Sequence, residues 1–296
     1  MTLFWAQLVN GLISGSFYAL MSLGIAIIFG LLRIANFVHG AQFMLGAFAA
    51  WFLLDLPNRF PDLGLPTINY WFALLLAPLI VGAVGLLTEV LFLRRVYELD
   101  HAYGLLLTIG LAMVIEGMFS LNFGVAGRPY PIPAALDGGF NFDFMYLPRY
   151  RAWVIGASIA VCAATWFLIE RTRLGAYLRA ATENPTLVEA FGIRVPRMLT
   201  LTYAMSVGLA ALAGVMAAPI TQVSAMMGSN IVIVIFAIVV IGGMGSILGS
   251  IVTGFGLGVV EALTRMVYPE ASTTVIFVVM AVVLLLRPDG LFGKAQ

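Results

Sequence analysis

Charged residues are scarce in this chain: they make up 10% of its 296 residues, whereas hydrophobic residues make up 62%. A soluble domain usually carries about 25% charged residues. A water-soluble fold of this length could not hide so much apolar surface, so the composition excludes a soluble globular protein. The apolar runs are also longer than the roughly ten alternating residues of a barrel strand, and they therefore predict membrane-spanning helices.

Cysteine and histidine are scarce as well. The single cysteine, Cys162, makes neither an internal disulfide nor a cysteine-rich metal site. The two histidines, His39 and His101, lie in different segments, without metal-ligand spacing. With no His-Glu-x-x-His string and no nucleophile–base pair, we expect neither a metal site nor an intramembrane enzyme. The net charge of +1 and the lack of a separate basic patch give no sign of a nucleic-acid partner.

Long apolar runs predict an all-α integral membrane protein, with about eight to nine transmembrane segments in a single domain over 1–296. The N-terminus lacks the basic region of a signal peptide, so the first run is expected to stay as an anchor. Residues 55–68 hold three prolines and are expected to form a loop. The expected spans are 4–32, 36–54, 69–93, 103–125, 152–170, 199–221, 231–267 with a break near 242–245, and 273–286. Two stretches, 36–54 and 231–244, could equally be half-helices or re-entrant segments that do not cross the membrane fully.

Polar side chains interrupt two of these spans. Asn10, Ser14 and Tyr18 are spaced four apart, so on a helix they form one slowly turning stripe. Such a stripe serves either helix packing or a substrate pathway, and both interpretations stay open. Glu116 lies near the middle of 103–125. A carboxylate there costs roughly 2.5–3.5 kcal/mol on insertion scales, so it is expected to face protein or water in a functional or a structural role.

A polar cluster follows the first span. Arg33, Asn36 and His39 are three apart and would share one face of a helix, either as part of a pathway or as a simple cytoplasmic turn. The stretch 39–48 also matches 242–251 at three positions in ten, either by coincidence or because paired glycine-interrupted segments mark a transporter's substrate site. The candidate pathway residues are Asn10, Ser14, Tyr18, Asn36, His39, Gly40, Glu116, Gly243, Gly245 and Ser246.

The polar stretch 171–198 carries five arginines between two apolar runs, so the positive-inside rule places it in the cytoplasm and the proline-rich loop 126–151 outside. Asn184 is a good N-cap, Pro185 suits the first helical position and Gly192 suits a C-terminal stop; together they predict a helix over 185–191. A second short helix is expected before it, with Leu174, Tyr177, Leu178 and Ala181 on one face. The two helices suit the transmission of force from a soluble partner.

The pattern of this stretch resembles the coupling loop of ABC importer permeases, and more narrowly that of the branched-chain amino acid permease family. Its matching residues are Gly175, Arg179, Ala180, Glu183, Asn184, Ala190, Gly192 and Ile193. Three more strings fit in order: Arg33-Ile34-Ala35-Asn36-Phe37-x-His39-Gly40, then Gly242-Gly243-Met244-Gly245-Ser246-x-x-Gly249, then Arg287-Pro288-x-Gly290-Leu291-Phe292-Gly293. Glu116 departs from the family pattern, in which a neutral or apolar residue is expected, and this bears on substrate choice.

The resemblance implies the permease subunit of an ATP-driven importer in a bacterial inner membrane. A second homologous permease, cytoplasmic ATPase subunits that grip the coupling loop, and a periplasmic binding protein would be its partners, besides membrane lipid. The chain has no Gly-x-x-x-x-Gly-Lys-[Ser/Thr] string, so it is expected to bind no cofactor itself and to rely on ATP hydrolysed by its partners. The implied substrate is a branched-chain amino acid, with urea, amides or aromatic acids as related possibilities. An ion-coupled transporter or channel is the alternative class.

Overall fold

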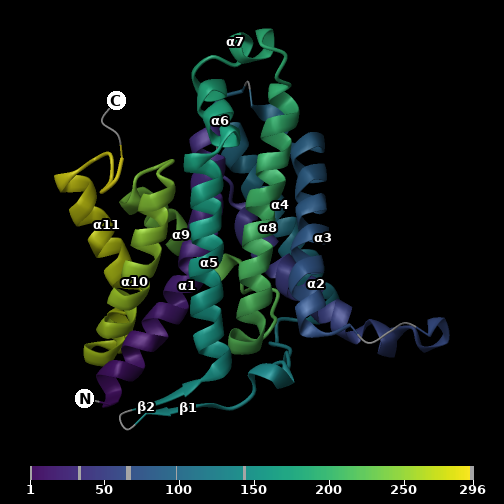
Figure 1. Ribbon diagram of the computed structural model, residues 1–296, viewed down its shortest axis with the longest axis vertical. Coiled ribbons are helices and arrows are strands. Elements are labelled where there is room, and N and C mark those ends of the chain that lie inside the picture. The colour runs from purple at the N-terminus through teal and green to yellow at the C-terminus, as the bar shows by residue number, and fades with distance from the viewer. Residues whose placement is uncertain (1, 33–34, 65–67, 98, 143–144, 294–296) are drawn as a thin grey trace. The chain divides into compact units, whose positions relative to one another are not determined.

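The computed structural model describes the whole chain except residues 1, 33–34, 65–67, 98, 143–144 and 294–296, and Figure 1 shows its elements. The described residues are mostly helical. The helices are α1 (Thr2–Leu32), α2 (Val38–Arg59), α3 (Tyr70–Leu91), α4 (His101–Phe123), α5 (Arg149–Arg171), α6 (Arg173–Glu183), α7 (Pro185–Ala190), α8 (Val195–Thr221), α9 (Ser229–Gly242), α10 (Ile247–Val267) and α11 (Thr274–Leu286). The strands β1 (Gly139–Phe142) and β2 (Met145–Pro148) form one antiparallel hairpin.

The helix lengths confirm an all-α membrane protein. Among the described residues, seven helices are long and apolar enough to cross a membrane, namely α1, α2, α3, α4, α5, α8 and α10. The apolar helices α9 and α11 have only 14 and 13 residues. At 1.5 Å per residue each reaches about 20 Å, short of the roughly 30 Å hydrocarbon core. Because α9 ends at Gly242 and α10 begins at Ile247, the run 231–267 breaks after Gly242, as the sequence predicts.

The predicted start of the loop at 55–68 is wrong, because α2 continues through Pro57 to Arg59. Proline removes only one backbone donor, and side chains hold this last turn together. The Arg59 guanidinium lies 2.8 Å from Asp55 and packs over the rings of Trp51 and Phe52. These contacts outweigh the helix-breaking tendency of a proline so close to the helix end.

The polar cluster after the first span also departs from its predicted geometry. Ala35 and Asn36 are not helical, and α2 begins only at Val38. Asn36 and His39 therefore do not share a helix face, and Arg33 lies outside the described residues. The described part of the loop 126–151 holds no α-helix before Arg149, where α5 begins three residues earlier than expected, and one short 3₁₀ helix at Ala134–Leu136. Its hairpin was not predicted, because it pairs only four residues on each side.

The chain forms two compact units, and each unit is assembled from stretches that are distant in sequence. Unit 1 consists of Met1–Arg33, Leu136–Thr202 and Ile233–Gln296, and unit 2 of Ile34–Ala135 and Tyr203–Val232. A single domain over 1–296 stays a prediction.

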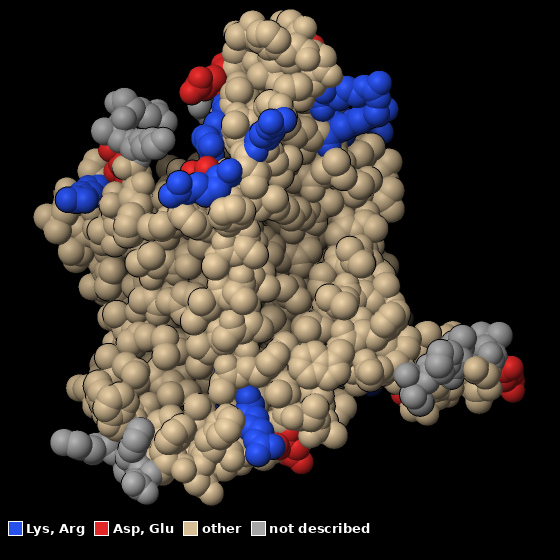
Figure 2. Space-filling view, viewed as in Figure 1, with Lys and Arg blue, Asp and Glu red and all other residues tan. Residues whose placement is uncertain are grey.

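In unit 1 the backbones of α1 and α10 touch through glycines. A Cβ on Gly258 would lie 2.4 Å from the backbone nitrogen of Gly15, and one on Gly11 would lie 2.7 Å from the Cα of Val259. Such close approach of membrane helices requires small residues at the crossing. The hairpin lies at one end of α5, whereas α6 and α7 lie at its other end (Figure 1). On the face seen in Figure 2, charged side chains gather near helix ends and leave the long helices bare between them.

Unit 2 is built around α2, which packs against α3, α4 and the part of α8 from Tyr203 onward. Here, too, glycines let backbones meet. A Cβ on Gly46 would lie 2.2 Å from the carbonyl oxygen of Ala211, and one on Gly214 would lie 2.0 Å from that of Phe43. The backbones of α2 and α8 therefore approach closely at these two positions.

Candidate functional site

The predicted coupling loop, residues 171–198, folds into the two short helices α6 and α7 within unit 1. The side chain of Asn184 accepts a hydrogen bond from the backbone of Leu187 at 2.9 Å, and Pro185 follows it as the first residue of α7. Gly192 ends the motif with φ at +82°, in the left-handed region that favours glycine. The capping signals therefore predicted the position of α7 to within one residue.

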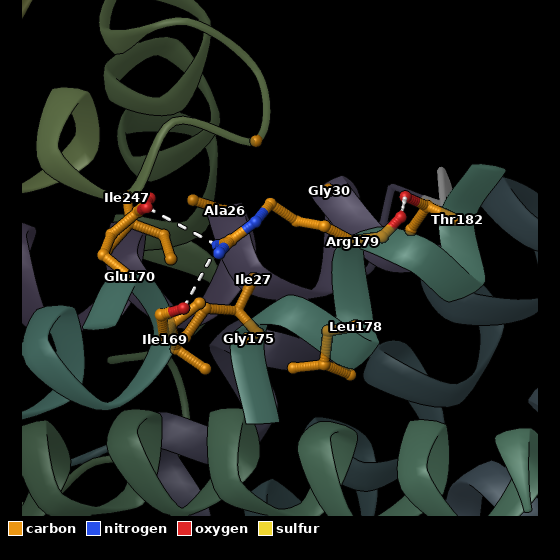
Figure 3. A pocket seen from close by; sticks show the side chains of 11 residues that line it. Ala26, Ile27, Gly30, Ile169, Glu170, Gly175, Leu178, Arg179, Thr182 and Ile247 are labelled. Atoms are coloured by element: carbon orange, nitrogen blue, oxygen red, sulfur yellow. Dashed lines mark hydrogen bonds and ion pairs between the residues drawn. The ribbon is translucent and has the colours of Figure 1, made fainter. Parts of the chain in front are cut away.

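Two contacts fix α6 against the end of α5. Gly175 lies so close to it that an added Cβ would come within 1.5 Å of the carbonyl oxygen of Ile169. The guanidinium of Arg179 donates to the same carbonyl at 3.1 Å and lies 3.5 Å from Glu170, as Figure 3 shows. A cation is favourable there because the C-terminus of a helix carries unsatisfied carbonyls. The pair with Glu170 adds little, since both side chains are about half exposed.

A small apolar core joins the two helices. Ala181 of α6, Val188 of α7 and Val195 of α8 are buried together, with Ile193, Met198 and Leu199 packed around them. The predicted apolar face of α6 is partly wrong, because Tyr177 is exposed while Gly175 is buried with Leu178 and Ala181. The contact between Gly175 and Ile169 sets the rotation of α6 and turns Tyr177 outward.

The outer surface of the coupling loop is apolar at two prominent positions. Leu187 is 55% exposed and Phe191 is 78% exposed. Of the residues that the family pattern singled out, Gly175 is buried and Ile193 half-buried. The exposed ones are Arg179, Ala180, Glu183, Asn184, Ala190 and Gly192. Most of this residue set therefore lies where a partner could contact it.

A pocket of about 90 Å³ lies beneath α6 in unit 1, and Figure 3 shows its lining. Its walls come from the end of α1 (Ala26, Ile27, Gly30), the end of α5, the inner side of α6, and Gly245 and Ile247 at the start of α10. The lining thus brings α6 together with three long helices.

The polar stripe on the first span makes structural contacts. Asn10 accepts a hydrogen bond from Arg151 of α5 at 3.0 Å, and Tyr18 donates to Glu261 of α10 at 2.6 Å. Glu261 also pairs with Arg265 at 2.6 Å, as their spacing predicted. Ser14 is half-buried. These contacts favour packing over a pathway for Asn10 and Tyr18.

The glycine-rich string near 242–246 forms the turn between α9 and α10. Gly243 and Gly245 have φ of +98° and +85°, and Ser246 caps α10 by accepting from the backbone of Gly249 at 3.1 Å. The chain end packs onto this turn, because the backbone of Leu291 donates to Ile241 at 2.8 Å and that of Phe292 to Gly242 at 3.2 Å. These residues shape a turn in unit 1, whereas Asn36, His39, Gly40 and Glu116 belong to unit 2.

In unit 2 the structure brings Asn36 into a buried polar cluster with two residues that the sequence did not single out. The side-chain amides of Asn36 and Gln42 each donate to the hydroxyl of Tyr203 at 3.1 Å, and all three side chains are buried, as is that of His39. No local pattern marks Tyr203, which is separated from Asn36 by 167 residues. Gln42 carries a weak signal, since it is an amide inside an apolar run.

Glu116 has a local partner. Hydrogen bonds join its carboxylate to the side chain and the backbone of Ser229, the first residue of α9. A carboxylate is stabilised at this position by the unsatisfied backbone N–H groups of the helix N-terminus. The structural role of Glu116 is therefore favoured over a functional one.

A second carboxylate in unit 2, the buried Glu89, is also well partnered. Arg94 lies 3.0 Å from it, and the hydroxyl of Tyr97 donates to it at 3.0 Å. Burial raises the pKa of Tyr97 above its ordinary value, and the neighbouring Glu89 raises it further. Tyr97 therefore stays protonated and remains a donor to Glu89. Over the described residues, no group of acidic, histidine or cysteine side chains is arranged to hold a metal ion.

Comparison with known proteins shows which family the chain is similar to. The chain is 28% identical to the high-affinity branched-chain amino acid transport system permease protein LivH of Salmonella typhimurium, over 99% of this chain and 96% of that protein. It is also 28% identical to the permease protein BraD of Pseudomonas aeruginosa, over 98% and 96%. No solved structure matches it. The family described as the permease component of the branched-chain amino acid transport system matches residues 7–284, and the chain, a multi-pass membrane protein, belongs to that family.

Proposed function

We propose that the chain is the membrane subunit of an ATP-driven importer of branched-chain amino acids in a bacterial inner membrane. It works by alternating access together with a second permease, separate ATPase subunits and a periplasmic binding protein. The chain itself catalyses no reaction and binds no cofactor. Membership of the permease family and the names of its full-length relatives support this function.

The surface of the coupling loop carries the proposal. Leu187 on α7 and Phe191 directly after it expose large apolar side chains outside the long apolar helices. Exposed apolar groups on a rigid base are typical of protein contact sites, because burying them against a partner is favourable. The small core of Ala181, Val188 and Val195 makes that base rigid. We assign this surface to the groove of the ATPase subunit.

The proposed transmission begins at α7 and continues through α6. Closure of the ATPases on ATP binding would push α7, and the shared core would carry the push to α6. From α6 it would pass to α5 through Gly175 and Arg179, and to α1 and α10 through the residues around the pocket. Because packed elements switch between discrete arrangements, a small displacement at α7 suffices to bias the spans.

The carboxylates on the long helices give no support to the ion-coupled alternative. Glu89 pairs with Arg94, Glu261 pairs with Arg265, and Glu116 bonds to Ser229. A proton or ion relay needs titratable groups that hand a charge from one to the next. Here each carboxylate is held by its own neighbour.

Co-purification tests the proposal first. The chain is extracted from its native membranes in mild detergent, and its stoichiometric partners are identified by mass spectrometry. We expect an ATPase and a second permease of similar size. Recovery of the chain alone, under conditions that preserve a known importer complex, would contradict the assignment.

The coupling surface has its own test. Phe191→Ser and Glu183→Lys should each reduce uptake at least tenfold while the chain stays folded. Phe140→Ser is the matched control: it also removes an exposed phenylalanine, but at the hairpin end of α5. It should leave ATPase binding intact. Normal uptake by both coupling-loop variants would refute the assignment of this surface.

A further inference from the structure

The pocket beneath α6, which we call the α6 pocket, combines two opposite charges with an aliphatic surface (Figure 3). Glu170 at the end of α5 and Arg179 of α6 line it and are exposed. The buried side chains that line it are all aliphatic, namely Ala26, Ile27, Ile169, Leu178 and Ile247. All of these residues belong to unit 1. The α6 pocket therefore suits a small molecule that has a charged end and an apolar end.

The volume of the α6 pocket limits the size of its ligand. One water molecule needs about 10–15 Å³ of such space, so a volume of about 90 Å³ holds roughly six to nine non-hydrogen atoms. A nucleotide or a whole lipid is far larger than this. A free amino acid with a medium-sized side chain has this size.

The guanidinium of Arg179 is held beside the pocket by one of its nitrogens and keeps two others available. Nη1 donates to the carbonyl oxygen of Ile169 at 3.1 Å and lies 3.5 Å from Glu170. Nε and Nη2 donate to no described residue. A guanidinium typically binds a carboxylate through two parallel N–H bonds. The two available nitrogens of Arg179 therefore suit the carboxylate of a ligand.

The carboxylate of Glu170 provides the opposite charge. Its contact with Arg179 is long, and both side chains are about half exposed. Because an exposed ion pair contributes little to stability, a ligand that offers better partners to both groups can replace it. An ammonium group is such a partner for Glu170, since it carries several N–H donors. The α6 pocket thus offers a cation and an anion side by side, and a free α-amino acid carries the two complementary charges on one carbon atom.

We infer that the α6 pocket binds a free branched-chain amino acid from the cytoplasm. The carboxylate of the ligand pairs with Arg179, its ammonium group pairs with Glu170, and its branched side chain packs against the aliphatic residues. The positive-inside rule places 171–198 in the cytoplasm, so the ligand is the imported product. This inference rests on the proposed function and adds regulation by the product.

A ligand in the α6 pocket should slow import. The pocket lies between α6, the ends of α1 and α5, and the start of α10. In the proposed transmission, α6 moves against these helices. A bound amino acid fills the space between them, and a close-packed interior resists compression. Accumulated product therefore opposes the movement of α6 and reduces further uptake.

The assay uses proteoliposomes in which the ATPases of the assembled transporter face the lumen. ATP and unlabelled leucine are enclosed, the binding protein is added outside, and the initial uptake of labelled leucine is measured. We expect enclosed leucine at millimolar concentration to lower the initial rate about fivefold or more. Three analogues each lack one recognised group: 4-methylpentanoate lacks the ammonium group, 3-methylbutylamine the carboxylate, and alanine the branched side chain. Each should inhibit about tenfold more weakly than leucine.

Glu170→Gln separates the α6 pocket from the transport pathway, because it removes the anion at nearly unchanged volume. The ratio of its uptake rates with and without enclosed leucine should show inhibition about tenfold weaker than in the wild type. Equilibrium binding of labelled leucine to the assembled transporter, without the binding protein, should weaken to the same degree. Glu270→Gln is the matched control, since Glu270 is another exposed glutamate of unit 1, in the 3₁₀ helix Pro269–Ala271, and does not line the pocket. It should stay fully sensitive to enclosed leucine.

The outcomes distinguish this regulation from the proposed function. If the wild type imports no leucine, the proposed function fails. If the wild type imports leucine and enclosed leucine does not slow it, the function stands and the regulatory role of the α6 pocket is wrong. That role is also wrong if Glu170→Gln binds leucine and is inhibited by it as strongly as the wild type, because leucine then acts in the transport pathway.

Discussion

Replacing Gly175 by alanine should uncouple the transporter without unfolding it. The new Cβ would lie 1.5 Å from the carbonyl oxygen of Ile169 and 2.5 Å from its carbon. Non-bonded carbon and oxygen atoms rarely approach closer than about 3.4 Å, so the start of α6 must move by about 2 Å from the end of α5. That movement would also pull Arg179 away from the same carbonyl, which it now reaches at 3.1 Å.

The assay compares leucine uptake and ATP hydrolysis in proteoliposomes that contain the assembled transporter. For Gly175→Ala we expect uptake to fall at least tenfold while ATP hydrolysis persists, because the ATPases still close but α6 no longer moves with α5. The matched control is Gly156→Ala in the neighbouring helix α5, where an added Cβ meets nothing within 4 Å. That variant should keep full uptake and gain up to about 1 kcal/mol of stability, since alanine favours a helix over glycine.

Two results would refute this reasoning. Normal uptake by Gly175→Ala would mean that the contact between α6 and α5 does not transmit the motion. Loss of uptake in Gly156→Ala to the same degree would mean that α5 tolerates no substitution, and the effect at Gly175 would then say nothing about coupling.

Further substitutions test the other contacts. Gly192→Val should destabilise the protein by about 1–2 kcal/mol, because Gly192 has a left-handed φ, and it should reduce uptake. Uptake assays compare it with Gly110→Ala as a control, since a Cβ on Gly110 would meet nothing within 4 Å. Tyr18→Phe should lower the unfolding temperature, because a hydrogen bond to a charged group contributes about 1.5–3 kcal/mol, yet leave the uptake rate within twofold. Glu116→Leu should destabilise the protein by about 0.5–2 kcal/mol through loss of the α9 cap, whereas Glu116→Gln should not, and thermal unfolding of the two variants side by side distinguishes them.

Features that depend on neighbouring residues were predictable from the sequence. The cap at Asn184, the proline after it and the glycine at 192 define α7 within a few residues, and the glycines at 242–245 mark the end of α9. The pair of Glu261 and Arg265 follows from a single helical turn. In each case the interacting groups lie within about eight residues, so the pattern itself carries the geometry.

Features that depend on distant residues were not predictable. The continuation of α2 past Pro57 needs the packing of Arg59 on two rings, and the outward turn of Tyr177 needs the contact of Gly175 with α5. The buried hydrogen bond between Gln42 and Tyr203 joins two residues that lie 161 positions apart. One sequence, read without its folded structure, holds no signal for such a pairing.

The packing of α1 against α10 has a consequence for biosynthesis. Tyr18 donates a hydrogen bond to Glu261, which the ribosome adds 243 residues later. At about 5–20 residues per second, the ribosome needs roughly 10–50 s to supply it. Over that interval the first helix stays in the membrane with its tyrosine hydroxyl and its glycine groove uncovered. The newly made chain therefore depends on lipid, the insertion machinery or a chaperone to shield α1 until the last third of the protein is inserted.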